Sequence, residues 1–210
     1  MLQRHGDGEV QDRRTILGQF QVFRNAAIDR IELDINQDVV RLLALRQPMA
    51  RDLREIFAAL RIASDIERIG DYAANVAKRS IVLNQSAPVR LANALPRLAR
   101  LAESLLRDVL LAWREDDADR ALDAWTRDEE LDELYTSLFR ELLTYMMEDP
   151  RNITPCTHLL FMAKNIERIG DHATNIAENV YFLVHGTLIE QARRKGDSTN
   201  SMVVPLDETP

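Results

Sequence analysis

Apolar residues recur along this chain at helical spacing, every three or four positions, and no stretch alternates with the period of a β-strand. The pattern predicts five helices, at about residues 15–45, 48–83, 89–114, 118–147 and 155–184. Asp116 and Asp117 are candidate helix caps in the short acidic turn "EDDAD". Pro48 suits the first turn of the second helix, while Pro96 either kinks the third helix or marks its start. The sequence therefore predicts an all-α protein.

The chain also contains an internal repeat. Leu60–Ser80 matches Leu160–Val180 at eleven of twenty-one positions, with an offset of 100 residues, and both segments contain "ERIGD". A second pair, "RNAAIDRIELDI" from Arg24 and "RDEELDELYTSL" from Arg127, matches with an offset of 103 residues. Two matches in the same order and nearly the same register indicate the duplication of a helical unit.

The duplication predicts two helical units. The first occupies residues 15–84 and the second 88–185, and the polar break "NQSAP" separates them. The helix near residues 89–114 has no counterpart ahead of the first unit, so we expect that unit to lack its first helix. Either the chain is truncated relative to its ancestor, or another protein chain fills the vacancy. Residues 1–14 and 186–210 are expected to be disordered.

Each ERIGD helix presents two acids one turn apart. Glu67 and Asp71 lie on the shoulder of a narrow apolar stripe, and Glu167 and Asp171 repeat the arrangement. Gly70 lies within that stripe, where small residues allow a neighbouring helix to approach closely. A like-charged pair at this spacing costs roughly 0.2–0.5 kcal/mol even when it is exposed. The pairs therefore call for a compensating partner.

The other duplicated helix offers matching acids. Asp128 and Asp132 again stand four residues apart, and their counterparts in the first copy are Asn25 and Asp29. If the helices of one unit pack together, these residues converge into two clusters. The first acidic site then contains Asn25, Asp29, Glu67 and Asp71, and the second acidic site contains Asp128, Asp132, Glu167 and Asp171. Such clusters require protonation, pairing with Arg or a bound metal.

Two interpretations of the acids stay open from the residues alone. They form either cation sites, for which oxygen ligands favour Mg²⁺, Mn²⁺ or Ca²⁺, or solvated helix faces paired with Arg68 and Arg168. A ferritin-like iron site requires Glu-x-x-His, and Gly170 stands where that His would be. Asn25 supplies no charge and would be a weak ligand. His172 is replaced by Tyr72 in the other copy, which favours a surface or helix-packing role over metal ligation.

Composition narrows the function further. The net charge of −7 and the pI near 5.2 argue against a nucleic-acid-binding protein. The single cysteine, Cys156, cannot form an internal disulfide, which favours a reducing compartment. No apolar run is long enough to cross a bilayer, and the N-terminus lacks the pattern of a signal peptide. We therefore expect a cytoplasmic protein.

Three motifs resemble the PhoU family of bacterial phosphate-uptake regulators. They are "LRQPMARDLREI" at Leu45–Ile56, "ERIGDYAANVAKR" at Glu67–Arg79 and "ERIGDHATNIAE" at Glu167–Glu178, and the acids Asp128 and Asp132 match as well. The resemblance covers about residues 24 to 184. It implies tandem antiparallel three-helix bundles, of the PhoU or spectrin-like repeat type, whose acidic motifs bind clusters of iron, zinc, manganese or magnesium. Asn25 departs from the family motif, which has an acid there.

The resemblance also implies a function. It predicts a non-enzymatic homodimer that negatively regulates phosphate uptake and phosphate-starvation signalling. The expected partners are a phosphate ABC transporter ATPase and a phosphate-sensing histidine kinase, with no nucleic acid, and membrane association only through these partners. A carboxylate-bridged metalloenzyme and a metal-free helical scaffold are the alternatives. In the regulator, the metal-ligand candidates are Asp29, Glu67, Asp71, Asp128, Asp132, Glu167 and Asp171.

Overall fold

The computed structural model describes residues 26–85, 90–190, 197 and 199, and over these residues the chain forms helices and no strand. The first described helix covers residues 26–46. The long helices that follow are α2 (Arg51–Leu83), α3 (Leu95–Glu115), α4 (Ala118–Glu148) and α5 (Ile153–His185). Short 3₁₀ helices, Arg90–Ala94 and Pro150–Asn152, precede α3 and α5. The predicted all-α class is confirmed.

Two of the three predictions tested here for helix starts are confirmed. Pro96 is in the first turn of α3 and marks its start. Asp117 caps α4, because its side chain accepts a hydrogen bond from the Arg120 backbone N–H at 2.9 Å. The prediction for Pro48 is wrong, since α2 begins only at Arg51. Positive φ angles at Gln47 and Ala50 turn the chain in this connection, and helical backbone cannot adopt them.

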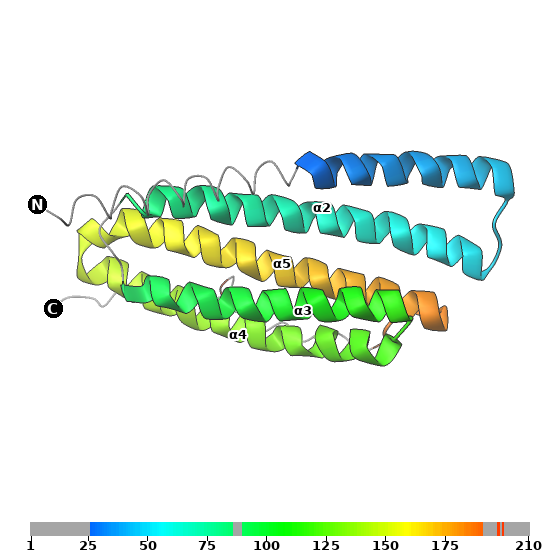
Figure 1. Cartoon of the computed structure of the whole chain (residues 1–210). Coiled ribbons are helices and arrows are strands. Elements are labelled where there is room, and N and C mark those ends of the chain that lie inside the picture. Colours follow the sequence, from blue (N-terminus) through cyan, green and yellow to red (C-terminus); the bar gives the residue numbers. More distant parts are fainter. Residues whose placement is uncertain (1–25, 86–89, 191–196, 198, 200–210) are drawn as a thin grey trace, which may run out of the picture.

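Helix α5 lies at the centre of the molecule, between α2 on one side and α3 and α4 on the other (Figure 1). The 26–46 helix folds back along α2 and lies on its outer side (Figure 1). The second unit thus contains three mutually packed helices, α3, α4 and α5. Within residues 26–85, the first unit contains two helices. None of the helices in the described ranges is both long and apolar enough to cross a membrane.

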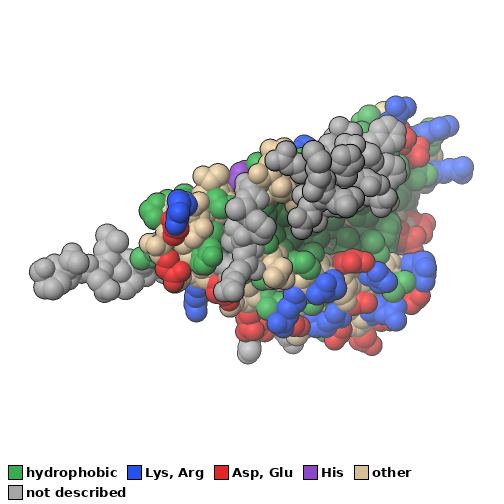
Figure 2. Space-filling model, turned by 60° about the vertical axis from the view of Figure 1, so that its left-hand side comes forward, with side chains coloured by type: hydrophobic (Ala, Val, Ile, Leu, Met, Phe, Trp, Pro, Cys, Tyr) green, Lys and Arg blue, Asp and Glu red, His purple; other side chains and the backbone are tan. Residues whose placement is uncertain are grey.

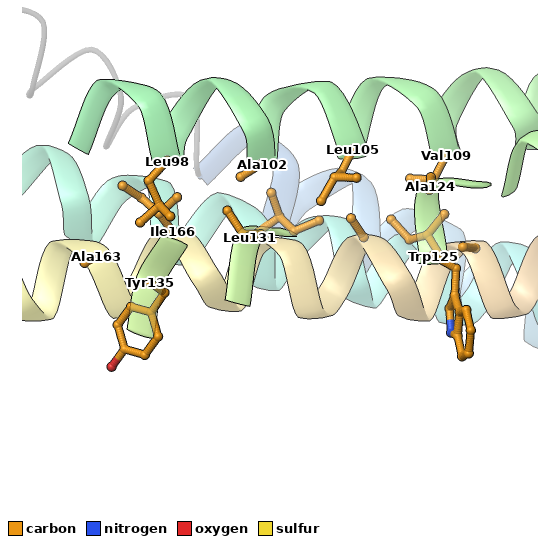
Figure 3. Close-up of a cluster of buried hydrophobic side chains, with 14 of the residues drawn as sticks. Leu98, Ala102, Leu105, Val109, Ala124, Trp125, Leu131, Tyr135, Ala163 and Ile166 are labelled. Atoms are coloured by element: carbon orange, nitrogen blue, oxygen red, sulfur yellow. The ribbon is translucent and has the colours of Figure 1, made fainter. Parts of the chain in front are cut away.

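The core of the second unit is built from one stripe of each helix. The apolar stripe of α3 projects towards α4 and α5 (Figure 3) and contains Leu98, Ala102, Leu105 and Val109. These residues are three or four positions apart, which is the helical period seen in the sequence. The side chains of Leu105, Val109, Leu131 and Ile176 are essentially inaccessible to solvent. Other core residues in the same cluster are Leu98, Ala102, Ala112, Leu138, Leu142, Leu159, Ala163, Ile166 and Val180.

Polar contacts join the two units along α2 and α5. His172 Nδ1 lies 2.8 Å from Asp65 Oδ1, and Asn175 Nδ2 donates a hydrogen bond to the same carboxylate oxygen at 3.2 Å. The His172 ring also contacts the Tyr72 ring, with 5.6 Å between ring centroids and a tilt of 34° between the ring planes. The expected helix-packing role of His172 is confirmed, and the partner is the other ERIGD helix.

Part of the C-terminal segment is placed against the second unit. Asp197 forms an ion pair with Lys164 of α5 at 3.0 Å, and its Oδ1 atom accepts hydrogen bonds from the backbone and hydroxyl of Thr199. The expected disorder of residues 186–210 stays a prediction. Sequence composition alone did not reveal the half-buried lysine that pairs with Asp197. The expected disorder of residues 1–14 lies outside the described residues.

Candidate acidic site

Helices α4 and α5 approach each other closely at Gly170. A Cβ atom at this position would collide with Leu131 and would lie 2.6 Å from Asp128 Oδ1. The glycine therefore lets the α4 backbone come within reach of the ERIGD helix, as the small-residue stripe predicts. Asp128 and Asp132 of α4 consequently lie beside Glu167 and Asp171 of α5.

The second acidic site is largely buried. Asp128, Asp132 and Glu167 are only 1%, 2% and 4% exposed. Burial raises the pKa of Glu167 to about 7, the hydrogen bond from Lys164 opposes this rise, and the charges of Asp171 and Asp132 add to it. The influence of both aspartates on Glu167 places them in one electrostatic cluster. Of the four acids expected to converge, Asp132 and Asp171 thus act on Glu167, and the Asp128 carboxylate lies beside Gly170.

Lys164 is the cation within this cluster. Its Nζ atom donates hydrogen bonds to Glu167 Oε1 at 2.8 Å and to Asp197 Oδ2 at 3.0 Å. The ammonium group also lies 4.9 Å from the centroid of the Tyr135 ring, which favours a positive charge. Burial lowers the pKa of Lys164, but the two carboxylate partners outweigh it and raise that pKa overall. Lys164 therefore stays charged and neutralises part of the site.

Neither Lys164 nor Asp197 was among the sequence-predicted site residues. Lys164 could have been found, because it precedes Glu167 by three residues and so faces the same side of α5. Asp197 could not, since nothing in the polar C-terminal segment indicates where it returns to the helices.

The first acidic site is more open and differently neutralised. Arg68 lies 3.5 Å from Glu67 and 3.9 Å from Asp71, and its own side chain is well exposed. Burial and the charge of Asp71 raise the pKa of Glu67, Arg68 opposes the rise, and Glu32 and Asp29 add to it. Asp29 is thus close to the ERIGD acids, as predicted, and Asn25 lies outside the described residues.

Glu32 is a member of the first site that sequence reasoning missed. It follows Asp29 by three residues on the same helix, and that spacing could have identified it. Its counterpart in the second copy, by the offset of 103 residues, is Tyr135, whose ring contacts Lys164. The two sites therefore differ in composition beyond the single change at Asn25.

The acidic side chains are suitable metal ligands by their chemistry, but their positions in this structure do not form a metal site. All candidate ligands are carboxylates, which suit hard divalent cations. Glu167 Oε2 is buried and accepts no hydrogen bond, so it could serve as a ligand atom. However, over the described residues no three His, Cys, Asp or Glu side chains converge on one point with the geometry of a metal site. Lys164 occupies the other oxygen of Glu167. A cation at this site therefore requires side chains to rearrange.

Comparisons with known proteins agree with this architecture. The family model described as "PhoU domain" matches residues 21–80 and 95–180. A "phosphate-specific transport system accessory protein PhoU homolog" from Xylella fastidiosa (strain 9a5c) is 59% identical over 181 residues, which are 86% of this chain and 76% of the relative. A protein of the same name from Rhizobium meliloti (strain 1021) is 51% identical over 187 residues, which are 89% of this chain and 79% of the relative.

Solved structures show the same arrangement of helices. The crystal structure of PhoU from Pseudomonas aeruginosa superposes with a TM-score of 0.81 at 39% sequence identity, and covers 84% of this chain and 85% of that one. The phosphate transport system regulatory protein PhoU from Streptococcus pneumoniae superposes with a TM-score of 0.74 at 28% identity, and covers 89% of this chain and 93% of that one. With its duplicated acidic helices and these matches, the chain belongs to the PhoU family.

Proposed function

We propose that this protein is a cytoplasmic regulator that represses phosphate uptake and phosphate-starvation signalling while phosphate is abundant. The observation that carries the proposal is the buried acidic cluster of α4 and α5, within a chain whose relatives are named as phosphate-transport accessory proteins. The protein acts through binding rather than turnover. Its expected partners are the ATPase of a phosphate ABC transporter and a phosphate-sensing histidine kinase, and it works as a homodimer that reaches the membrane only through these partners.

The regulatory role is tested by deleting the gene. Phosphate-starvation reporters should be derepressed in phosphate-rich medium, and a plasmid copy of the gene should restore repression. Reporter output that stays at the wild-type level after deletion overturns the proposal. Co-purification of the tagged chain with the transporter ATPase and with the kinase tests the two partners separately.

Metal binding is a second part of the proposal, and Glu167 is its centre. A divalent cation of the iron, zinc, manganese or magnesium group would be held by carboxylates of the second acidic site. It would have to displace Lys164 from Glu167 Oε1, and Asp197 would keep the released ammonium group paired at 3.0 Å. The bound cation would neutralise the buried acidic cluster and hold α4 and α5 together, and the partners would contact the outer surface of these helices.

Metal analysis of protein purified without chelator tests this part. We expect at least one equivalent per chain after back-titration, and Lys164→Met should bind the cation more tightly because a competing charge is gone. Less than one equivalent in both proteins would instead support the metal-free scaffold.

The two acidic sites should differ in metal affinity. Asp132→Ala, which alters the buried second site, should lose more metal than Asp29→Ala, which alters the open first site. Asp29→Ala serves as the matched control, because it removes the same carboxylate from the duplicated position. Equal losses in the two variants would contradict this difference.

A further inference from the structure

Two arginines lie over aromatic rings along the face that α2 and α5 share. The Arg79 guanidinium of α2 is 4.2 Å from the centroid of the Phe161 ring of α5. The Arg168 guanidinium of α5 is 5.6 Å from the centroid of the Tyr72 ring of α2. Contact with a ring face holds a guanidinium group in place but uses none of its five N–H donors. Arg79 and Arg168 therefore keep donors that can bind a carboxylate.

Several arginines elsewhere on the molecule pair with acids instead. Arg107 of α3, for example, lies 2.8 Å from Glu103. In Figure 2, Lys and Arg side chains lie among Asp and Glu side chains along the lower part of the surface, over α3 and α4. Among the residues that the structure describes, neither Arg79 nor Arg168 pairs with a carboxylate. Their charge is therefore available to another molecule.

Other exposed side chains extend this surface. Val82 follows Arg79 by three residues and Lys78 by four, so it lies beside both on α2. Val82 is 45% exposed, Phe161 is 48% exposed, and Lys78 is exposed as well. The surface thus combines three cations with accessible apolar groups. We call it the basic patch, and its members are Tyr72, Lys78, Arg79, Val82, Phe161 and Arg168.

The internal duplication shows that packing does not require these cations. By the offset of 100 residues, Arg79 corresponds to Asn179 and Lys78 corresponds to Glu178. Asn179 and Glu178 line an open cleft between α2 and α5 at the other end of the shared face. The two helices pack together at both ends, with an amide and an acid at one end and two cations at the other. The basic patch is therefore a surface feature that the fold does not need.

The composition of the patch favours a protein as its partner. Arginine and aromatic side chains are enriched at the centres of protein–protein interfaces, where the most strongly contributing contacts lie. Anionic membranes and nucleic acids are bound by larger clusters of Lys and Arg. An extended polyanion would also meet the two acidic sites on the same helices, in a chain whose net charge is −7. A short acidic segment of a protein can contact the patch alone.

We propose that the basic patch binds an acidic amphipathic helix of a partner protein. Tyr72 and Arg79 are seven residues apart on α2, and Phe161 and Arg168 are seven residues apart on α5. The two arginine–ring contacts are therefore about 10.5 Å apart along the helices. Carboxylates at positions i and i+7 of a helix that lies along α2 and α5 have the same separation, and an aliphatic residue between them contacts Phe161. The inference rests on the proposed function, since it names a surface through which the protein binds a partner.

A designed helical peptide labelled with fluorescein is the probe. It has two Glu seven residues apart with two Leu between them on the same face, in a background of Ala and Gln. Its control peptide has Gln in place of both Glu. Fluorescence anisotropy against the full chain should show saturable binding, at least about tenfold tighter for the Glu peptide at low salt. Rising salt should remove that advantage, because the contacts are exposed to solvent.

Arg79→Gln and Arg61→Gln form a matched pair of protein variants. Both remove an arginine from α2 beside α5, but Arg61 lies in the cleft at the other end of the shared face. Arg79→Gln should weaken binding of the Glu peptide about fivefold and leave the Gln peptide unchanged. Arg61→Gln should change neither. Phe161→Ala should weaken both peptides, because the ring contacts the leucines.

Two outcomes with the peptides would overturn the inference. The Glu peptide binds no more tightly than the Gln peptide, or Arg79→Gln and Arg61→Gln lose equal affinity. Circular dichroism confirms that each variant is folded. The reporter assay of the deletion strain tests the phosphate-related role separately, so derepression together with a failure of the peptides would overturn this inference alone.

Three outcomes would assign the patch to another occupant and so also overturn the inference. The protein sediments with vesicles of phosphatidylglycerol and phosphatidylcholine and Arg79→Gln abolishes this, which makes a lipid surface the partner. The protein self-associates in analytical ultracentrifugation and Arg79→Gln abolishes this, which makes a second copy the partner. The peptide binds only after residues 1–25 or 191–210 are removed, which makes a segment of the chain itself the occupant.

Discussion

The raised pKa of Glu167 makes the stability of the protein depend on pH in a defined window. A carboxyl whose pKa is raised from 4.5 to about 7 binds more protons in the folded than in the unfolded chain between these two values. Its contribution to the free energy of unfolding is complete below about pH 4.5 and is lost as the pH rises through 7. One tenfold change in proton affinity is worth about 1.4 kcal/mol, so the full loss is about 3 kcal/mol.

Glu167→Gln removes this titration while keeping the size and hydrogen-bonding ability of the side chain. The variant should be close to the wild type at pH 4.5 and more stable by up to about 3 kcal/mol at pH 8, where the wild type carries a buried charge. Urea unfolding followed by circular dichroism, in buffer with EDTA to remove metals, measures the difference. Because Glu167 is only 4% exposed, solvent screening reduces the effect little.

Glu67→Gln at the duplicated position is the control. Its pKa is also raised, but the side chain is more exposed and Arg68 lies 3.5 Å away, so its pH-dependent effect should be much smaller. The reasoning is refuted if Glu167→Gln changes stability equally at pH 4.5 and pH 8. A pH-dependent effect of the same size in both variants would show that burial is not its cause.

Three further substitutions test the packing and the caps by urea unfolding. Gly170→Ala should lower the free energy of unfolding by about 1–2 kcal/mol, because the added Cβ crowds Asp128 and its neighbours. This cost outweighs the gain of up to ~1 kcal/mol in helix propensity. A more stable variant would contradict the close approach of the helices. Asp117→Ala should cost about 1 kcal/mol by removing the cap on the Arg120 N–H, and an unchanged midpoint would mean that water replaces it. Leu105→Ala should cost about 2–5 kcal/mol, and a cost below 1 kcal/mol would mean that the core around it collapses.

The helices and the acid clusters could be predicted because they depend on short-range spacing. The apolar period and the cap at Asp117 placed α4 at residues 118–147, and the structure has Ala118–Glu148. Glu167 and Asp171 are neighbours on any helix, and duplication identified the second helix that faces them. The prediction at Pro48 was wrong because the left-handed turn at Gln47 and Ala50 depends on how the two helices meet.

Contacts between distant segments could not be predicted from spacing. The carboxylate of Asp65 binds His172 and Asn175 across more than a hundred residues, and nothing in either ERIGD copy indicates that the two copies pack on each other. Asp197 pairs with Lys164 for a similar reason: the half-buried ammonium group gains from a second anion, but the sequence does not say which one. Both contacts depend on which side chains the packed helices bring together, and this is known only once the helices are assembled.

The central position of α5 has a consequence for the order in which the protein forms. Both units pack against Ile153–His185, yet among the described helices this is the last to leave the ribosome. Until it emerges, α2 has no partner for its inner face, and α3 and α4 form an incomplete pair with exposed leucines. The nascent chain is therefore most prone to aggregation while α2–α4 are outside the ribosome without α5, and both units become stable together when it arrives.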